Sequence, residues 1–221
     1  MTSQHPSTRL ASKELTRQAL VRAALKLLAD NSFDSLSLRE VTKEAGITPT
    51  AFYRHYDDME QLGLDLVDES FGSLGAMLKD ARSQSPFEGD AIERSLAVVV
   101  RHMHGHRAHF RFIARERYGG VRRLRRAIHR ELQLFADELA IDLVAMPGVD
   151  GWSTEDRRML AGVITDTIIV MVADLLEAGG EHEQEIVERT TRQLRLITLG
   201  IPAWGGSAAE TVPTPPGAVA S

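Results

Sequence analysis

The 221-residue chain contains no cysteine. A disulfide framework, a thiolate nucleophile and a zinc site held by cysteine are therefore excluded. The absence fits a reducing cytoplasm, which is the location we expect. Aromatic residues are also scarce, at 5% of the chain, whereas hydrophobic residues make up 43% and charged residues 26%. This composition is typical of a helix-rich globular protein.

Two further absences concern membranes and catalysis. The N-terminus has no apolar segment of the signal-peptide kind, and the most apolar run, 163–176, is interrupted by Asp166 and Asp174. We therefore expect neither a signal peptide nor a membrane span. The chain also lacks the Gly-x-Ser-x-Gly, phosphate-loop and His-Glu-x-x-His motifs. Nothing in it predicts an enzyme or a cofactor.

Charge is distributed unevenly along the chain. The formal net charge is −5, which by itself argues against a nucleic-acid partner. Up to Tyr56, however, the chain has eight basic residues and only five acidic ones. This positive N-terminal part favours an anionic partner for that part alone.

The clearest motif in the sequence lies at 36–62. Ser37 and Glu40 have the spacing of a capping box and begin a predicted helix at 38–45. Gly46 follows, at the position where left-handed backbone ends many helices.

A second helix is predicted directly after the first, at 49–56. Thr48 is placed as its N-cap, and Pro49 takes the first helical position, where a missing N–H costs nothing. Two short helices joined by a tight, glycine-containing turn make a helix-turn-helix.

The whole chain is predicted to be all-α, with about nine helices, because apolar residues recur at helical spacing. Helix one begins near Lys13. Beyond the motif, glycine and proline breaks place helices at about 59–84, 90–105, 108–118, 121–145, 154–178 and 183–199. We expect a flexible arm at 1–10, a helix-turn-helix DNA-binding domain at 11–58, a helical regulatory and dimerisation domain at 59–201 and a disordered tail at 202–221.

The second helix of such a motif enters the major groove of DNA, and the first crosses the phosphate backbone. Thr50, Ala51 and Arg54 fall on the outward face, where they suit base edges. The other candidates suit phosphates. The predicted DNA-binding residues are Lys13, Arg17, Ser37, Arg39, Thr48, Thr50, Ala51, Tyr53, Arg54 and His55. A helical ligand-binding or interaction module without DNA binding remains the alternative.

At this point the sequence resembles a known family. Helix one and the stretch FDSLSLREVTKEAGITPTAFYRHYDDMEQLGLDLVDE are similar to the N-terminal DNA-binding domain of TetR-family transcriptional regulators. The later FRFIARERYGG and RRAIHREL, with weaker motifs, resemble the FabR/DesT-type subgroup, which represses unsaturated fatty-acid synthesis. The resemblance implies a homodimer on a palindromic operator. It also implies a C-terminal domain that senses long-chain acyl-CoA or acyl-carrier thioesters. The alternative is a TetR-type regulator of efflux or catabolism genes that binds another hydrophobic molecule.

Dimerisation has its own support in the sequence. Within the helix predicted at 154–178, residues 163–176 are apolar on nearly all sides, more than one core requires. A symmetric dimer needs a self-complementary apolar surface of this kind. The predicted dimer residues are Val163, Thr167, Val170, Met171, Ile186, Thr190, Leu194 and Ile197. The alternative is the buried centre of a monomeric bundle.

An acyl chain would need a dry apolar lining. The candidate ligand residues are Leu66, Phe71, Leu74, Met77, Leu78, Val99, Met103, Phe110, Ile113, Arg115, Arg117 and Phe135. The apolar members are also ordinary packing candidates.

Two clusters of one residue type remain. A basic run comprises Arg115, Arg117, Arg122, Arg123, Arg125, Arg126 and Arg130. It could receive the phosphates of coenzyme A or an acidic carrier protein, or it could be a solvated helix face. A histidine run has partly helical spacing but no interleaved carboxylate, so we expect no metal there; it comprises His102, His104, His106 and His109.

Overall fold

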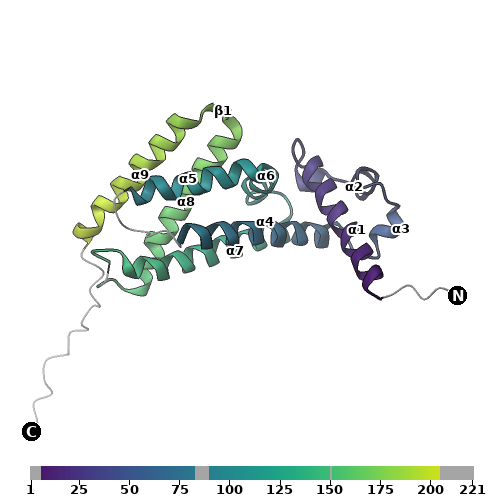
Figure 1. The fold of residues 1–221 in the computed structure, drawn as a ribbon, viewed down its shortest axis with the longest axis horizontal. Coiled ribbons are helices and arrows are strands. Elements are labelled where there is room, and N and C mark those ends of the chain that lie inside the picture. Colours follow the sequence, from purple (N-terminus) through teal and green to yellow (C-terminus); the bar gives the residue numbers. More distant parts are fainter. Residues whose placement is uncertain (1–5, 83–89, 150, 205–221) are drawn as a thin grey trace, which may run out of the picture.

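The computed structural model describes residues 6–82, 90–149 and 151–204, with the backbone alone at a few helix positions, including 6–10 and 76–82. Within these residues the chain is helical apart from short links (Figure 1). The elements are α1 (Pro6–Leu27), η1 (Phe33–Ser35), α2 (Leu38–Glu44), α3 (Pro49–Phe52), α4 (Met59–Arg82), α5 (Ala91–Gly105), α6 (Arg107–Glu116), α7 (Arg122–Asp142), η2 (Leu143–Ala145), α8 (Thr154–Ala178), β1 (Gly179–His182) and α9 (Glu183–Trp204).

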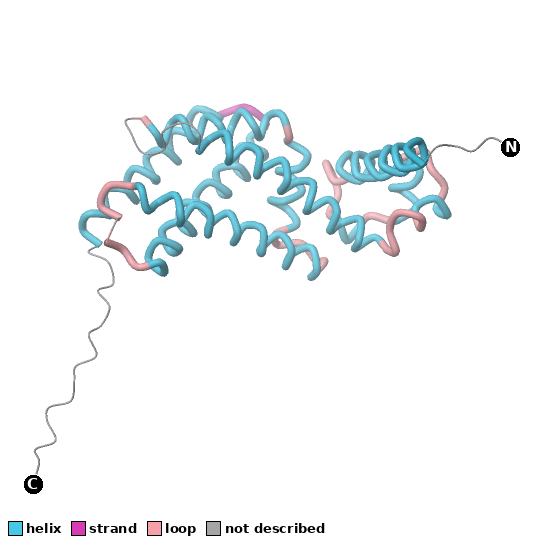
Figure 2. The backbone as a smooth tube through the Cα atoms, turned by 60° about the horizontal axis from the view of Figure 1, so that its bottom comes forward, coloured by secondary structure: helices cyan, strands magenta, loops and turns pink. Residues whose placement is uncertain are grey.

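The helices form a small N-terminal domain and a larger helical body. Figure 1 shows α1, α2 and α3 gathered at one end of an elongated molecule, with α4 leading from them into the body. In the body, α7 packs against both α4 and α8, and α9 packs against α8 and α5. Figure 2 shows the same division from a second direction. The two domains are thus joined covalently by one long helix.

The all-α prediction is confirmed, and the departures from it are local. β1 is a four-residue extended link between α8 and α9 in which Gly180 and His182 adopt positive φ. Helix α1 begins at Pro6, so residues 6–10 are helical where an arm was expected. At the other end, α9 continues through Pro202 to Trp204. Residues 1–5, 83–89 and the predicted tail from 205 onward lie outside the described residues.

The predicted recognition helix at 49–56 is shorter than expected. The α-helix covers Pro49–Phe52, and the chain then tightens into a turn. His55 N–H donates to the carbonyl of Phe52 at 2.8 Å, and Arg54 N–H donates to that of Ala51 at 3.2 Å. These three-residue spacings are those of a 3₁₀ turn, which often ends a helix.

Three apolar clusters hold the described residues together. The first joins the N-terminal domain to α4, α6 and α7, and includes Phe33, Phe52 and Leu124. The second lies among α5, α6, α8 and α9 and includes Met103. The third, around Trp152, lies near the ends of α7 and α9. The first cluster crosses the boundary between the two domains, so the domains share a core.

By length and composition alone, helix α8 is long and apolar enough to cross a membrane. Of its apolar 18-residue stretch, 33% is buried within this chain. A core helix of an ordinary globular protein meets the same criterion. The exposed apolar side chains on it include Val163 at 47% and Val170 at 56%. An apolar surface of this kind favours a partner.

Two glycines of α4 provide a test of the shared core. A Cβ at Gly63 would lie 2.7 Å from Cζ of Phe33 and 2.8 Å from Cδ2 of Leu124, whereas one at Gly72 would meet nothing within 4 Å. We expect Gly63→Ala to destabilise the protein by about 1–3 kcal/mol through overpacking. Gly72→Ala should stabilise it by roughly 0.5–1 kcal/mol, because alanine is the better helix former. Chemical unfolding measures both, and equal effects of the two changes would contradict the close packing at Gly63.

Candidate nucleic-acid interface

The helix-turn-helix is built on side-chain caps. Ser37 Oγ accepts from the N–H of Glu40 at 3.3 Å, and Ser37 N–H donates to Glu40 Oε2 at 2.9 Å, which completes the predicted capping box. Thr48 Oγ1 accepts from the N–H of Ala51 at 3.2 Å, and Gly46 between the helices has a φ of 69°. These bonds fix the turn by satisfying helix-end amides that would otherwise lack partners.

The recognition segment separates inward from outward side chains. Phe52 is fully buried and Tyr56 is 5% exposed, and their rings pack at 5.5 Å between centroids. Tyr53 is 61% exposed, and Thr50 and Arg54 are exposed too. The outward set therefore carries a hydroxyl, a phenol and a guanidinium, which are side chains that bind bases and phosphates.

A polar network fixes the end of the recognition segment. The Tyr56 hydroxyl donates to Asp65 Oδ2 on α4, and Arg17 Nη1 on α1 donates to the same oxygen at 2.7 Å. Arg17 also pairs with Glu14 at 2.9 Å and with Glu69 at 3.5 Å. Burial, followed by the bond to Asp65, raises the pKa of Tyr56, so its phenol stays protonated. The network ties α1, α4 and the recognition segment into one unit.

This network gives Arg17 a role that the sequence did not reveal. Its bonds to Glu14 and Asp65 raise its pKa further. The predicted contact between Arg17 and a phosphate would have to break these ion pairs. In the sequence, only Glu14, three residues before Arg17, indicates such a role. The other partners, Asp65 and Glu69, lie on α4, 48 and 52 residues away.

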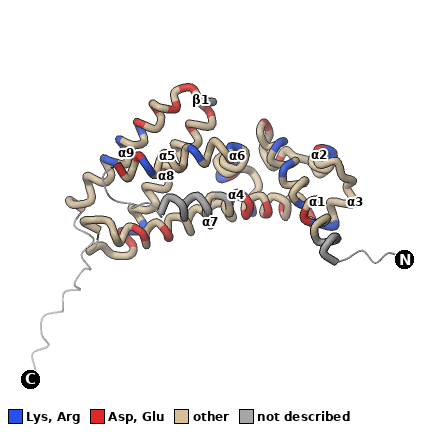
Figure 3. Tube along the Cα trace, in the orientation of Figure 1, with Lys and Arg blue, Asp and Glu red and all other residues tan. Residues whose placement is uncertain are grey.

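Other predicted DNA-binding residues come together on the same end of the molecule. Burial lowers the pKa of His55, and the charges of Lys13 and Arg54 lower it further. Arg39 is exposed on α2. Figure 3 shows basic positions on α1 and α2 in the N-terminal domain. Exposed basic side chains therefore belong to the same domain as the exposed recognition residues.

The predicted ligand residues are divided between two clusters. Leu66, Phe71, Ile113 and Phe135 belong to the cluster shared with the N-terminal domain. Val99, Met103 and Phe110 belong to the cluster among α5, α6, α8 and α9. Leu74 packs against both. The side chains of Met77 and Leu78 lie outside the described residues.

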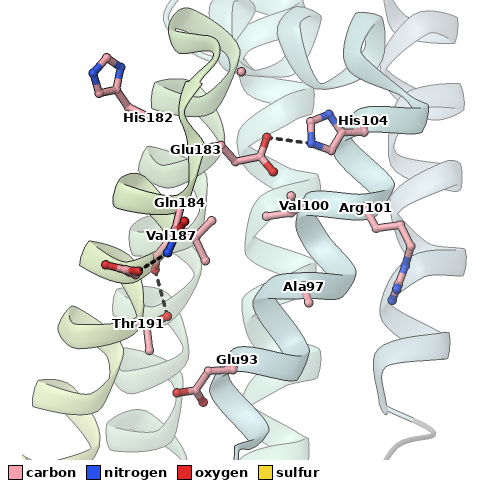
Figure 4. A pocket seen from close by; sticks show the side chains of 12 residues that line it. Glu93, Ala97, Val100, Arg101, His104, His182, Glu183, Gln184, Val187 and Thr191 are labelled. Carbon is pink, nitrogen blue, oxygen red and sulfur yellow. Dashed lines mark hydrogen bonds and ion pairs between the residues drawn. The ribbon is translucent and has the colours of Figure 1, made fainter.

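An open groove of about 930 Å³ runs between α5 and α9 and is lined by none of these residues. Figure 4 shows His104 of α5 and Glu183 of α9 facing each other across it, at 2.9 Å between Nε2 and Oε2. A second ion pair, between Glu93 and Arg195, links the same helices. Ala97 and Val100 contribute an apolar floor, next to the cluster that contains Met103.

The basic run does not form one phosphate receptor. Arg115 Nη1 donates to the carbonyl of Asn31 at 2.6 Å, and Arg125 Nη1 donates to that of Gly119. Arg117 lies over the Tyr118 ring, 4.6 Å from its centroid. Its remaining members are exposed on α7: Arg122, Arg123, Arg126 and Arg130. The run is thus divided between internal contacts and a solvated helix face.

The histidine run packs rather than converging on a point. The His102 and His106 rings stack at 4.2 Å between centroids, and His109 Nδ1 lies 3.0 Å from Ser70 Oγ. Burial lowers the pKa of His109, as do the neighbouring His106 and His102. Among the described residues no group of three potential ligands is arranged to hold a metal ion.

Comparison with known proteins agrees with the local geometry. Residues 20–66 match the family model described as bacterial regulatory proteins, tetR family. This part of the chain is therefore similar to the DNA-binding domain of that family. The match covers the end of α1, the helix-turn-helix and the first turns of α4, including Asp65 of the polar network.

Solved structures of TetR-type and related regulators share the whole fold. Regulatory protein TetR from Rhodobacter sphaeroides matches with a TM-score of 0.62 at 20% identity, over 81% of this chain and 96% of that one. The transcriptional regulator FadR from Bacillus subtilis, in complex with stearoyl-CoA, matches with a TM-score of 0.64 at 18% identity, over 83% and 98%. The fatty acid degradation regulator FadR from Bacillus halodurans matches with a TM-score of 0.62 at 14% identity, over 91% and 97%. At these identities the likeness shows the fold alone.

The recognition segment contains two tyrosines, one that stabilises the fold and one that is exposed. We expect Tyr56→Phe to destabilise the protein by about 1 kcal/mol, because the hydroxyl bond to Asp65 is lost. Tyr53→Phe removes an exposed hydroxyl and should leave stability within about 0.5 kcal/mol of the original. Urea unfolding compares the two variants, and an unchanged midpoint for Tyr56→Phe would show that the polar network contributes little.

Proposed function

We propose that this TetR-type regulator is a homodimeric repressor that binds a palindromic operator and controls fatty-acid synthesis genes, unsaturated fatty-acid genes in particular. Its effector is a long-chain acyl-CoA or acyl-carrier thioester. The observation that carries the DNA-binding part is the capped helix-turn-helix, whose exposed Thr50, Tyr53 and Arg54 stand on a segment anchored by Phe52 and Tyr56.

The exposed apolar surface of α8 and α9 supports the dimer. Val163 and Val170 are exposed on α8, and Leu196 and Leu199 are 72% and 76% exposed on α9. Four of the predicted dimer residues are already buried within one chain, namely Met171, Ile186, Thr190 and Leu194. The surface available for a partner therefore consists of the exposed set, including Leu199, which helical spacing suggests, and Leu196, which it does not. A twofold dimer would place the recognition segments about 34–36 Å apart, or a multiple of that.

Two observations support a hydrophobic effector. The cluster among α5, α6, α8 and α9 is apolar and lies under the open groove between α5 and α9. A regulator of the same fold was solved with stearoyl-CoA. Each buried methylene of an acyl chain contributes about 0.8 kcal/mol, so a long chain can supply the differential affinity that shifts a conformational equilibrium.

The recognition segment can be tested by removing its two largest outward side chains. We expect Tyr53→Ala combined with Arg54→Ala to lower operator affinity by about a hundredfold or more, since each lost contact costs about 1–3 kcal/mol and a dimer loses both twice. Fluorescence anisotropy on a duplex selected by the unmodified protein from a random pool measures the change. If each monomer makes three or four charged phosphate contacts, the salt slope should be about −5 to −7.

Arg126→Ala is the matched control, because Arg126 is exposed on α7 and its loss changes the net charge by the same amount as Arg54→Ala. Sedimentation should show that all variants keep the oligomeric state of the unmodified protein. Unchanged DNA affinity in the double variant would refute the assignment of the recognition segment.

The effector can be tested by varying the acyl chain. We expect oleoyl-CoA to shift operator affinity by about tenfold or more, octanoyl-CoA to shift it less and coenzyme A alone to leave it unchanged, because the chain supplies the binding energy. Mass analysis of lipids that copurify with the protein gives an independent identification. No shift with any thioester would remove the lipid effector and leave the DNA-binding regulator in place, with another hydrophobic molecule as its effector.

A further inference from the structure

A polar connection joins the two domains, in addition to the covalent path through α4 and the shared apolar cluster. It converges on the loop between α1 and α2, in which Phe33 opens η1. Glu116, the last residue of α6, is 1% exposed, and its Oε1 accepts a 2.9 Å hydrogen bond from the backbone N–H of Phe33. Its Oε2 is buried and has no hydrogen-bond partner among the described residues. A buried carboxyl group that binds a distant backbone amide restrains both segments.

The neighbouring Arg115 strengthens this connection. Its Nη1 donates to the carbonyl oxygens of Asn31 at 2.6 Å and Leu28 at 3.3 Å, directly after the end of α1. Carbonyls at the end of a helix lack partners within the helix, so a basic side chain that reaches them from another element stabilises the helix end. Two successive residues of α6 therefore hold the backbone of the same loop.

The turn after α6 lies close to the carboxyl groups of Glu116 and of Asp34 in this loop. A Cβ at Gly119 would lie 2.1 Å from Glu116 Oε2, and one at Gly120 would lie 2.5 Å from Asp34 Oδ2. The ring of Phe33 is held from another side, because Cζ would lie 2.7 Å from a Cβ at Gly63. The loop is thus enclosed by α4, α6 and the turn that leads to α7.

Helix α6 also connects this loop with the candidate effector region. Its Phe112 and Ile113 are buried in the cluster shared with the N-terminal domain, and its Phe110 is buried in the cluster among α5, α8 and α9. A change of packing in the second cluster therefore reaches Glu116 within two turns of one helix.

We propose that Glu116 is a positioning residue for DNA binding: through its bond to the Phe33 amide, it makes the orientation of the DNA-binding domain follow α6. The covalent link through α4 and the shared apolar cluster hold the two domains together, but apolar contacts are non-directional and specify a rotation about α4 only loosely. The bond at Phe33 adds a directional contact to this packing, and that contact defines the rotation. Only the DNA-affinity consequence rests on the proposed function, because the attachment itself involves neither DNA nor effector.

An intramolecular distance tests the attachment directly. Because the chain has no cysteine, Lys43→Cys on α2 and Ser95→Cys on α5, both exposed, take spin labels at two defined places. Double-labelled chains diluted with excess unlabelled chain give one intramolecular distance distribution by pulsed electron paramagnetic resonance. We expect Glu116→Ala to widen or shift this distribution, since the Phe33 amide loses its acceptor.

Two variants serve as comparisons. Glu116→Gln keeps a carbonyl oxygen for the Phe33 amide and should retain the original distribution. Glu155→Gln removes the same charge at an exposed position on α8 and should change nothing. An unchanged distribution in Glu116→Ala overturns the proposal, and a Gln variant that behaves like the Ala variant contradicts the assigned hydrogen bond.

A glycine pair keeps the test decisive where Glu116→Ala fails to fold. Gly119→Ala displaces the Glu116 carboxyl group while the glutamate is still present, whereas Gly105→Ala adds a methyl group with nothing within 4 Å. We expect the first to alter the distance distribution and the second to leave it as it was. Identical distributions for both would contradict the attachment.

Operator affinity tests the consequence for function. If about a tenth of the Glu116→Ala molecules hold the competent orientation, apparent affinity falls about tenfold, with Glu116→Gln close to the unmodified protein. A widened distance distribution with unchanged affinity overturns the positioning role. Failure of the unmodified protein to bind any duplex counts instead against the proposed function, and the distance measurement still decides whether Glu116 fixes the domain.

Discussion

The burial of Phe33, Phe52 and Leu124 in one apolar cluster is the interaction on which the other features depend. The helix-turn-helix is made of a seven-residue helix and a four-residue helix, and isolated helices of that length are unstable in water. They exist because their apolar sides pack against α1 and α4, while caps satisfy their ends. The same cluster reaches α6 and α7, so the recognition segment is stable only as part of a core that the regulatory helices complete.

Within this shared core, polar contacts at the boundary between the two domains add direction to the apolar packing. Tyr56, Asp65 and Arg17 bind one another where three elements meet, and Glu116 binds the Phe33 amide from a fourth. Polar groups that are buried, like Glu116, or partly buried, like Arg17 and Asp65, cost free energy unless they are paired, which favours these particular arrangements. Apolar packing brings the domains together, and these bonds decide their relative orientation. The proposed dimeric regulator requires a defined orientation, since its two recognition segments would have to match two half-sites.

The candidate site was only partly predictable. Capping residues at Ser37 and Thr48 and the outward Thr50 and Arg54 followed from local spacing, because caps and helix faces depend on residues within one turn of each other. The engagement of Arg17 by Asp65 did not, since its partner lies 48 residues away. The residues that line an effector site could not be predicted either. Helical spacing identifies which faces are buried, but it does not show which of these faces enclose the same space.

The sequence by itself determined the helices, their breaks and the helix-turn-helix, because these depend on local apolar periodicity, glycine, proline and capping side chains. Only the tertiary structure decided which apolar residues are buried in one chain and which, such as Leu196 and Leu199, remain exposed. It also decided that Glu116 meets Phe33 and that the basic run divides between internal bonds and solvent. These outcomes depend on contacts between helices far apart in the chain, which no local pattern encodes.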